Sequence, residues 1–242
     1  MATLRLALAQ LNVTVGDLDG NRRLIEEAIR RAQAWMADLV VVPELALPGY
    51  PPEDLLLKPQ FVEANLQALQ RLTSAAQGLV ALVGYVDRDP QGRLYSAAAV
   101  LTDGRRVATY RKQCLPNYGV FDEQRYFTPG SQPLVVEVRG VRVGVTICED
   151  LWEEAPCRAV AASGAQVVAN FLLSPLAQAR KADIAQWGDP TVLALDKLPA
   201  PERARFNAAA LPGQVEQTRP TILEPHGSWV DPLEKEWLRR YG

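Results

Sequence analysis

Histidine is nearly absent from this sequence of 242 residues, which contains only His226. Cysteine is also scarce: Cys114, Cys148 and Cys157 are the only three, and their spacing matches no zinc-binding pattern. We therefore expect no metal site and no chemistry that depends on a histidine base. An odd number of cysteines does not suggest a disulfide framework either, and a reducing cytoplasm is the expected setting.

A bias toward one sign of charge is also missing, because 26 basic residues face 28 acidic ones. No basic stripe is present that would predict binding to nucleic acid. The sequence has no apolar run of about 18 residues, so we expect no membrane span. Its first residues alternate like a strand and lack a signal-peptide cleavage pattern. With 48% hydrophobic residues, the chain can bury the core of one large α/β domain or two small ones.

Short β-branched and apolar runs alternate with segments of helical periodicity, which is typical of a layered α/β fold with mixed sheets. We predict strands at 4–11, 39–42, 79–86, 94–101, 107–110, 134–138, 141–147 and 166–170, and helices at 22–35, 61–76 and 155–163. Proline becomes frequent beyond about residue 189. We therefore divide the chain into a core, 1–180, and a divergent C-terminal segment, 181–242.

Cys148 stands where the β-branched run 141–147 ends and the chain turns into Glu149 and Asp150. A thiol at the end of a buried strand is available as a nucleophile. A free cysteine there is also typical of an inert, buried core residue. Residues elsewhere in the chain must decide between the two interpretations.

Glu44 and Lys112 follow two other apolar strands in the same way. A carboxylate partly withdrawn from water has a raised pKa and can act as a general base, although Glu44 could equally bond backbone amides. An ammonium group at Lys112 could stabilise an oxyanion, although a lone lysine is usually a solvated surface residue. Together, thiol, carboxylate and ammonium suit hydrolysis of an amide through a thioester, with no histidine required.

The motifs around these residues resemble the nitrilase, or carbon–nitrogen hydrolase, superfamily. Three segments resemble, within it, the glutaminase domain of glutamine-dependent NAD+ synthetases: 43–56, 115–127 and Cys148-Glu-Asp-Leu-Trp152. The resemblance runs from about residue 4 to about residue 180. It implies a four-layer αββα sandwich of the nitrilase type, with an atypical C-terminal segment, in which Glu44 is the general base, Lys112 the oxyanion stabiliser and Cys148 the nucleophile.

The resemblance also implies a set of substrate-binding residues. Glu123 suits either the α-amino group of glutamine or charge pairing with Lys112, and Arg180 suits the α-carboxylate. For the aromatic residues of this set, ordinary packing is the alternative. The implied residues are Tyr50, Tyr118, Glu123, Trp152, Ser174 and Arg180. Cys114 stands where the family often has histidine, which places a second thiol near the site.

Three hypotheses about function follow from the resemblance. The chain hydrolyses glutamine and supplies ammonia to an NAD+ synthetase; it hydrolyses another small amide; or it is a catalytically impaired, truncated remnant that acts as a binding or structural module. The amidase reaction needs no cofactor. ATP and deamido-NAD would belong to a synthetase module, whose Ser-Gly-Gly-x-Asp-Ser pyrophosphate loop is missing from this sequence. A homo-oligomer is also implied.

Overall fold

The computed structural model describes residues 3–119 and 121–171. Five strands form one sheet in the order β1-β2-β3-β4-β5, and three form a second in the order β6-β7-β8. The strands are β1 (Leu6–Leu8), β2 (Leu39–Val41), β3 (Val80–Arg88), β4 (Leu94–Thr102), β5 (Arg105–Arg111), β6 (Leu134–Val138), β7 (Val141–Ile147) and β8 (Val167–Phe171). The helices are α1 (Leu18–Ala34), α2 (Pro59–Leu72) and α3 (Glu154–Ala162), with short 3₁₀ turns at Glu53–Leu57, Thr73–Ala75, Glu123–Arg125 and Cys148–Leu151.

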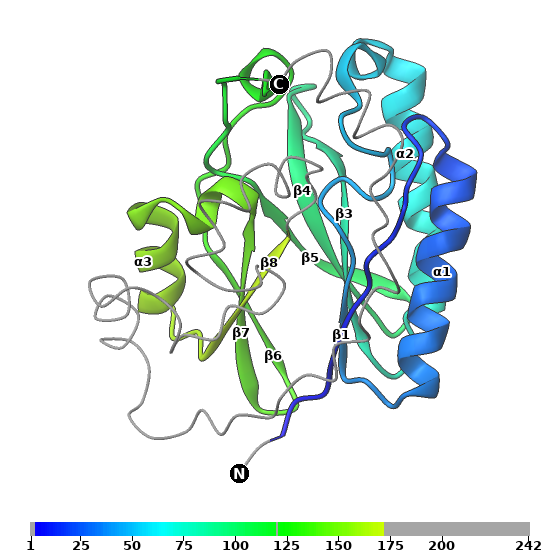
Figure 1. Cartoon of the computed structure of the whole chain (residues 1–242), viewed down its shortest axis with the longest axis vertical. Coiled ribbons are helices and arrows are strands. Elements are labelled where there is room, and N and C mark those ends of the chain that lie inside the picture. Colours follow the sequence, from blue (N-terminus) through cyan, green and yellow to red (C-terminus); the bar gives the residue numbers. More distant parts are fainter. Residues whose placement is uncertain (1–2, 120, 172–242) are drawn as a thin grey trace, which may run out of the picture.

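The elements stack in four layers, as Figure 1 shows. Helices α1 and α2 cover the outer face of the five-stranded sheet, the three-stranded sheet packs on its inner face, and α3 lies outside the second sheet. The predicted αββα sandwich is therefore confirmed. Both sheets are mixed. In the larger sheet β1, β2 and β3 pair in parallel, whereas β3, β4 and β5 are antiparallel. In the smaller sheet β6 and β7 are antiparallel, and β7 and β8 are parallel.

Helix α1 begins at Leu18 because Asp17 caps it, its side chain accepting a hydrogen bond of 2.9 Å from the backbone N–H of Gly20. Its core side chains, Ile25, Ile29 and Ala32, recur every three to four residues and face the sheet. Fully burying an isoleucine contributes about 1.5–3 kcal/mol, so this stripe fixes the outer layer.

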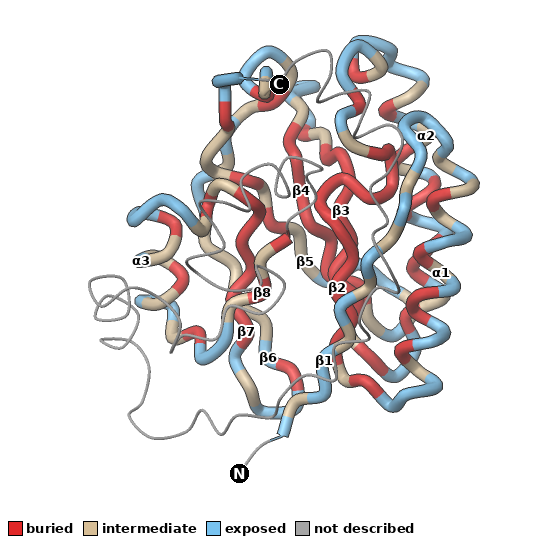
Figure 2. The backbone as a smooth tube through the Cα atoms, in the orientation of Figure 1, coloured by how far each residue is buried: buried red, intermediate tan, exposed pale blue. Residues whose placement is uncertain are grey.

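One hydrophobic core lies under α1 and α2, and a second lies between the two sheets. Figure 2 shows the central strands of the larger sheet as buried. Leu82 and Val100 from the larger sheet meet Val143, Val145 and Ile147 from β7 in the second core. Strand β7 is therefore buried on its way to Cys148, and the nucleophile candidate belongs to the same core.

Most predicted elements are confirmed, with shifted ends. The strand predicted at 4–11 is wrong in extent, because only Leu6–Leu8 pairs with β2 at the edge of the sheet. The hairpin at Arg139 and Gly140 is confirmed, and both residues adopt the positive φ that a tight two-residue turn requires. The C-terminal segment predicted at 181–242 lies outside the described residues.

Candidate active site

Glu44 follows β2 in a tight turn that is buried inside the sandwich. Its side chain is 1% exposed. The turn fits because residue 84 in β3 is glycine: a Cβ there would lie 2.3 Å from the Pro43 carbonyl oxygen and 2.5 Å from the Leu45 nitrogen. Gly84 therefore lets the backbone that carries Glu44 lie directly against β3, a role that no sequence pattern predicted.

Lys112 follows β5 and extends into the interior, where its side chain is 0% exposed. The interpretation as a solvated surface lysine is therefore wrong. Its backbone N–H donates to the Ser96 carbonyl at 2.9 Å, and its own carbonyl accepts from the Gly130 N–H at 2.7 Å. The preceding Arg111 pairs with Asp87 at 2.7 Å, which anchors the end of β5.

The ammonium group of Lys112 contacts two buried carboxylates. Its Nζ atom lies 2.8 Å from Glu44 Oε1 and 2.8 Å from Glu123 Oε2. The hydroxyl of Tyr50 donates to Glu123 Oε1 at 3.2 Å, and the Ser96 hydroxyl donates to Glu44 Oε1 at 3.4 Å. Of the two roles predicted for Glu123, charge pairing with Lys112 is the contact observed.

One ammonium between two carboxylates leaves an excess of negative charge in a buried cluster, and the pKa values of the three groups are shifted. Burial raises the pKa of Glu44, although Lys112 opposes the shift. Burial and then the charge of Glu44 raise the pKa of Glu123 to about 7. Burial alone would lower the pKa of Lys112, but Glu44, Cys148 and Glu123 raise it overall. Lys112 therefore stays charged, while both carboxyl groups titrate at a higher pH than an ordinary carboxyl group.

Cys148 begins the turn after β7 with a φ of 46°, in the left-handed region that residues other than glycine rarely adopt. Strain of this kind is common where a fold presents a functional side chain. Cys148 is buried, with 7% of its surface exposed. Burial, then Glu44, raises its pKa well above the ordinary value, while Lys112 lowers it. The charges of Glu44, Lys112 and Glu123 thus all act on a thiol that is neutral at rest and needs a base.

The described geometry gathers a thiol, a carboxylate and a buried ammonium after the ends of three strands. A family model described as "Carbon-nitrogen hydrolase" matches residues 5–191. The chain belongs to the carbon–nitrogen hydrolase family. It is therefore a hydrolase of carbon–nitrogen bonds, as the resemblance implied.

Several relatives of this hydrolase carry a more specific name. It is 47% identical over 179 residues to a glutamine-dependent NAD(+) synthetase of Thermotoga maritima, which covers 72% of this chain and 31% of the relative. It is also 47% identical over 186 residues to the synthetase of Xanthomonas campestris, covering 74% of this chain and 33% of the relative. The chain thus spans about a third of the length of the curated relatives it matches.

The similar solved structures include synthetases and amidases. The glutamine-dependent NAD+ synthetase of Acinetobacter baumannii superposes with a TM-score of 0.69 at 35% identity, covering 76% of this chain and 36% of the other. An amidase from Nesterenkonia sp. AN1 superposes with a TM-score of 0.66 at 26% identity, covering 81% of this chain and 72% of the other. In that amidase structure, the acetamide moiety of fluoroacetamide is attached covalently to the active-site cysteine.

The other predicted residues of this hydrolase occupy different positions. Tyr50 is partly buried beside Glu123, and the charges of Glu44, Glu123 and Cys148 act on its hydroxyl. Tyr118 is 46% exposed, and its hydroxyl donates to Glu149 Oε1 at 2.8 Å, next to the nucleophile candidate. Trp152 is 46% exposed at the end of the turn that begins at Cys148. Ser174 and Arg180 lie outside the described residues.

The second thiol near the site, Cys114, lies beside Asp150. Burial, then the charge of Asp150, raises the pKa of Cys114 to about 12, and a hydrogen bond to the Asp150 side chain acts in the same direction. The proton therefore stays on Cys114 near neutral pH.

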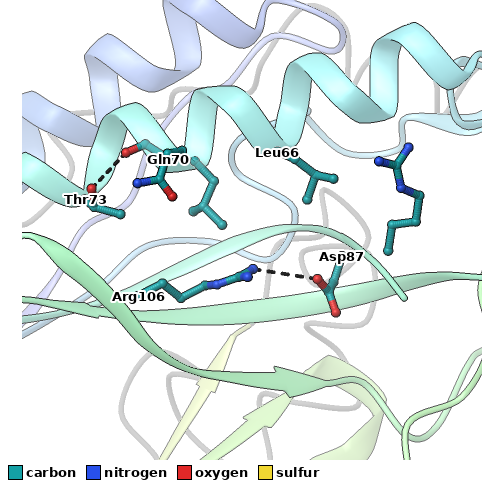
Figure 3. Close-up of a pocket in the computed structure, with 7 residues that line it drawn as sticks. Leu66, Gln70, Thr73, Asp87 and Arg106 are labelled. Carbon is teal, nitrogen blue, oxygen red and sulfur yellow. Dashed lines mark hydrogen bonds and ion pairs between the residues drawn. The ribbon is translucent and has the colours of Figure 1, made fainter. Parts of the chain in front are cut away.

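A hollow of about 230 Å³ lies away from this chemistry, between α2 and strands β3 and β5 (Figure 3). Its charged groups are already paired: Arg106 lies 3.7 Å from Asp87, and Arg88 lies 2.7 Å from Glu63. The hollow contains none of Glu44, Lys112 and Cys148. We therefore place the site at the carboxylate–ammonium cluster rather than at this hollow.

Within residues 3–119 and 121–171, no helix has the length and apolar character needed to cross a bilayer. Within the same residues, no group of three or more histidine, cysteine, aspartate or glutamate side chains is arranged to hold a metal ion.

Proposed function

We propose that this hydrolase converts glutamine into glutamate and ammonia, with Cys148 as nucleophile, Glu44 as general base and Lys112 as oxyanion stabiliser. The observation that carries the proposal is the buried contact of Lys112 with Glu44, beside a thiol whose pKa responds to both charges. The synthetase relatives, which are named glutamine-dependent, support glutamine as the amide.

In the first half-reaction Glu44 accepts the Sγ proton of Cys148, and the sulfur attacks the carboxamide carbon of the substrate. The carbonyl π electrons move to oxygen, where the ammonium of Lys112 stabilises the negative charge. The C–N bond then breaks, the nitrogen takes the proton held by Glu44, and ammonia leaves. A thioester between Cys148 and the glutamyl group remains.

In the second half-reaction Glu44 takes a proton from water, and the hydroxide attacks the thioester carbon. Collapse of this intermediate breaks the C–S bond, and the Cys148 sulfur takes the proton held by Glu44 as glutamate leaves. Each step uses only side chains of this chain, so the reaction requires no cofactor.

The substrate contacts extend the proposal. Tyr50 donates to Glu123 beside Lys112, while Tyr118 and Trp152 both contact Glu149, the residue after Cys148. Arg180 is the proposed contact to the α-carboxylate, and Ser174 completes the proposed set. The charged ends of glutamine distinguish it from simple amides, so these residues select the substrate.

The released ammonia would be consumed by an ammonia-dependent NAD+ synthetase, which also binds ATP and deamido-NAD. The names of the sequence relatives support this partner. Cys114, Cys148 and Cys157 are all free thiols, which fits a reducing compartment such as the cytoplasm. We also propose that the chain assembles into a homo-oligomer. The chain would divide into a core at 1–180 and a C-terminal segment at 181–242.

A second candidate function is hydrolysis of another small amide. The amidase from Nesterenkonia supports it, because 81% of this chain superposes on that enzyme. Ammonia release from glutamine and from a panel of aliphatic amides separates the candidates. A higher kcat/KM for glutamine supports the first, and a preference for an aliphatic amide supports the second. No ammonia from any amide would overturn both and leave the non-catalytic hypothesis.

A further inference from the structure

We propose that the buried carboxylate of Asp150 is a positioning residue, which fixes Lys112 and Cys148 relative to each other by holding the backbone beside both. The inference rests on the proposed roles of these two residues. Asp150 lies two residues after Cys148, is 0% exposed and contacts neither Glu44 nor Lys112 directly among the described hydrogen bonds.

The carboxylate accepts four hydrogen bonds, two on each oxygen. Oδ1 accepts from the backbone N–H groups of Gln113 at 2.9 Å and Cys114 at 2.7 Å. Oδ2 accepts from the Tyr110 hydroxyl at 2.8 Å and the Ile147 N–H at 3.1 Å. Three of the four donors are backbone N–H groups, which cannot accept a hydrogen bond, so the ionised carboxylate is the form that fits.

The donors come from the segments that carry the site. Tyr110 precedes Lys112 by two residues, and Gln113 and Cys114 follow it directly. Ile147 immediately precedes Cys148 and ends β7. Because β5 belongs to the five-stranded sheet and β7 to the three-stranded sheet, this one side chain joins the two sheets where they carry the ammonium and the thiol.

A second buried aspartate shows what a purely structural carboxylate looks like in this chain. Asp89 is 6% exposed and also accepts four hydrogen bonds, from the Gln91 and Arg93 backbones, the Arg93 side chain and Tyr95. All of these donors lie in its own turn between β3 and β4 or in β4 itself. Asp150 differs because its donors lie in two stretches of chain far apart in the sequence, 110–114 and Ile147.

The charge of Asp150 also reaches the proposed base. Its negative charge contributes to the raised pKa of Glu44, after the larger effects of burial and Lys112. Removing that charge should therefore move the acid limb of the Cys148 reaction to lower pH. A carboxylate that only stabilises the fold would not move this limb.

The experiment uses the full chain with Asp150→Asn, and Asp89→Asn as the matched control. The asparagine amide would place a second donor against the Ile147 N–H and disturb the turn that begins at Cys148. The probe is iodoacetamide, and peptide mass spectrometry gives the alkylation rate of Cys148 as a function of pH. Steady-state kcat and KM for glutamine, and the thermal unfolding temperature, are measured in parallel.

For Asp150→Asn we expect kcat to fall on the order of 100-fold, the effect of a misplacement of about 1 Å, while KM changes far less. Alkylation of Cys148 should slow about 10-fold or more, and its acid limb should move to lower pH. Asp89→Asn should lower the unfolding temperature without either change. Wild-type alkylation rate and limb in Asp150→Asn, or equal losses in both variants with no shift, would overturn the proposal.

A third variant covers the case in which Asp150→Asn does not fold. Tyr110→Phe removes one of the four donors and leaves the carboxylate in place, and it should slow Cys148 alkylation by about 5-fold, in line with the loss of one hydrogen bond of about 1 kcal/mol. A wild-type rate in Tyr110→Phe would then overturn the proposal. Alkylation needs no turnover, so a wild type that releases no ammonia would contradict the proposed function while Asp150 is still tested.

Discussion

The ammonium of Lys112 lies 2.8 Å from a carboxylate oxygen of Glu44, and the two side chains are 0% and 1% exposed. A buried ion pair is costly to form, and removing one partner leaves the other charge without compensation. A second carboxylate, Glu123, shares the same ammonium at 2.8 Å. Because burying three charged groups is costly, stability alone does not explain this arrangement. The cluster determines the behaviour expected of the variants below.

Lys112→Met removes the cation from this cluster. The proposed role of Lys112 is on the oxyanion, which exists only in the transition state and the intermediates, so kcat should fall by a factor of about 100–1,000 while KM changes less. The two carboxylates lose their counter-ion, and the free energy of unfolding should drop by about 3–5 kcal/mol. Steady-state kinetics and urea unfolding measure the two effects. An unchanged kcat would remove Lys112 from the mechanism.

The proposed base should appear in the pH profile. Glu44 must be deprotonated to accept the thiol proton, and burial has raised its pKa above the ordinary carboxyl value of 4.5. The rate should therefore fall as the pH drops through this raised pKa. A profile of kcat/KM against pH measures the limb. A profile with no acid limb above the ordinary carboxyl value of 4.5 would contradict the role of Glu44.

Glu123→Gln should change how stability depends on pH. The pKa of Glu123 is raised to about 7 in the folded chain, so the folded state holds a proton that the unfolded state releases. Wild-type stability from this group is present at low pH and is lost as the pH rises through about 7. The unfolding temperature of Glu123→Gln minus that of wild type should therefore become more positive from about pH 5 to about pH 8. A constant or falling difference would show that the Glu123 carboxyl is not perturbed in this way.

Gly84→Ala tests how the fold positions Glu44. The added Cβ would meet backbone atoms of Pro43 and Leu45 at 2.3 and 2.5 Å, and backbone cannot rotate away as a side chain can. We expect a loss of about 1–3 kcal/mol of stability from overpacking, together with reduced kcat. Gly144→Ala is a useful comparison because its Cβ would first meet the side chain of Val160. Full activity in Gly84→Ala would show that the Glu44 turn tolerates displacement.

The sequence predicts the strand ends well and their side-chain partners poorly. Glu44 follows a wholly apolar strand and Cys148 a strand rich in β-branched residues, local patterns that need no knowledge of the rest of the fold. The partners of Lys112 lie 68 and 11 residues away, so its burial follows only from tertiary structure. A lone lysine carries no local signal for such a position, and only the resemblance to the carbon–nitrogen hydrolases indicated it.

The residues that sequence reasoning missed share the same reason. Gly84 and Ser96 act on Glu44 across neighbouring strands, and no spacing along the chain marks them. Asp150 had a weak local signal, because it stands three residues after Ile147 and bonds back to its N–H as a capping residue does. The edge position of β1 explains why the strand predicted at 4–11 shortens to three residues, since only one side of it is paired.

The most direct test of the account is ammonia release from glutamine by wild type, Cys148→Ala and Cys157→Ala. Cys157 is a matched control because it is also a thiol, and it lies in α3, where its sulfur donates to backbone carbonyls rather than facing Glu44 and Lys112. We predict that Cys148→Ala releases no ammonia above the uncatalysed rate, while Cys157→Ala retains activity near that of wild type. Equal ammonia release by wild type and Cys148→Ala would contradict the central claim that Cys148 is the nucleophile.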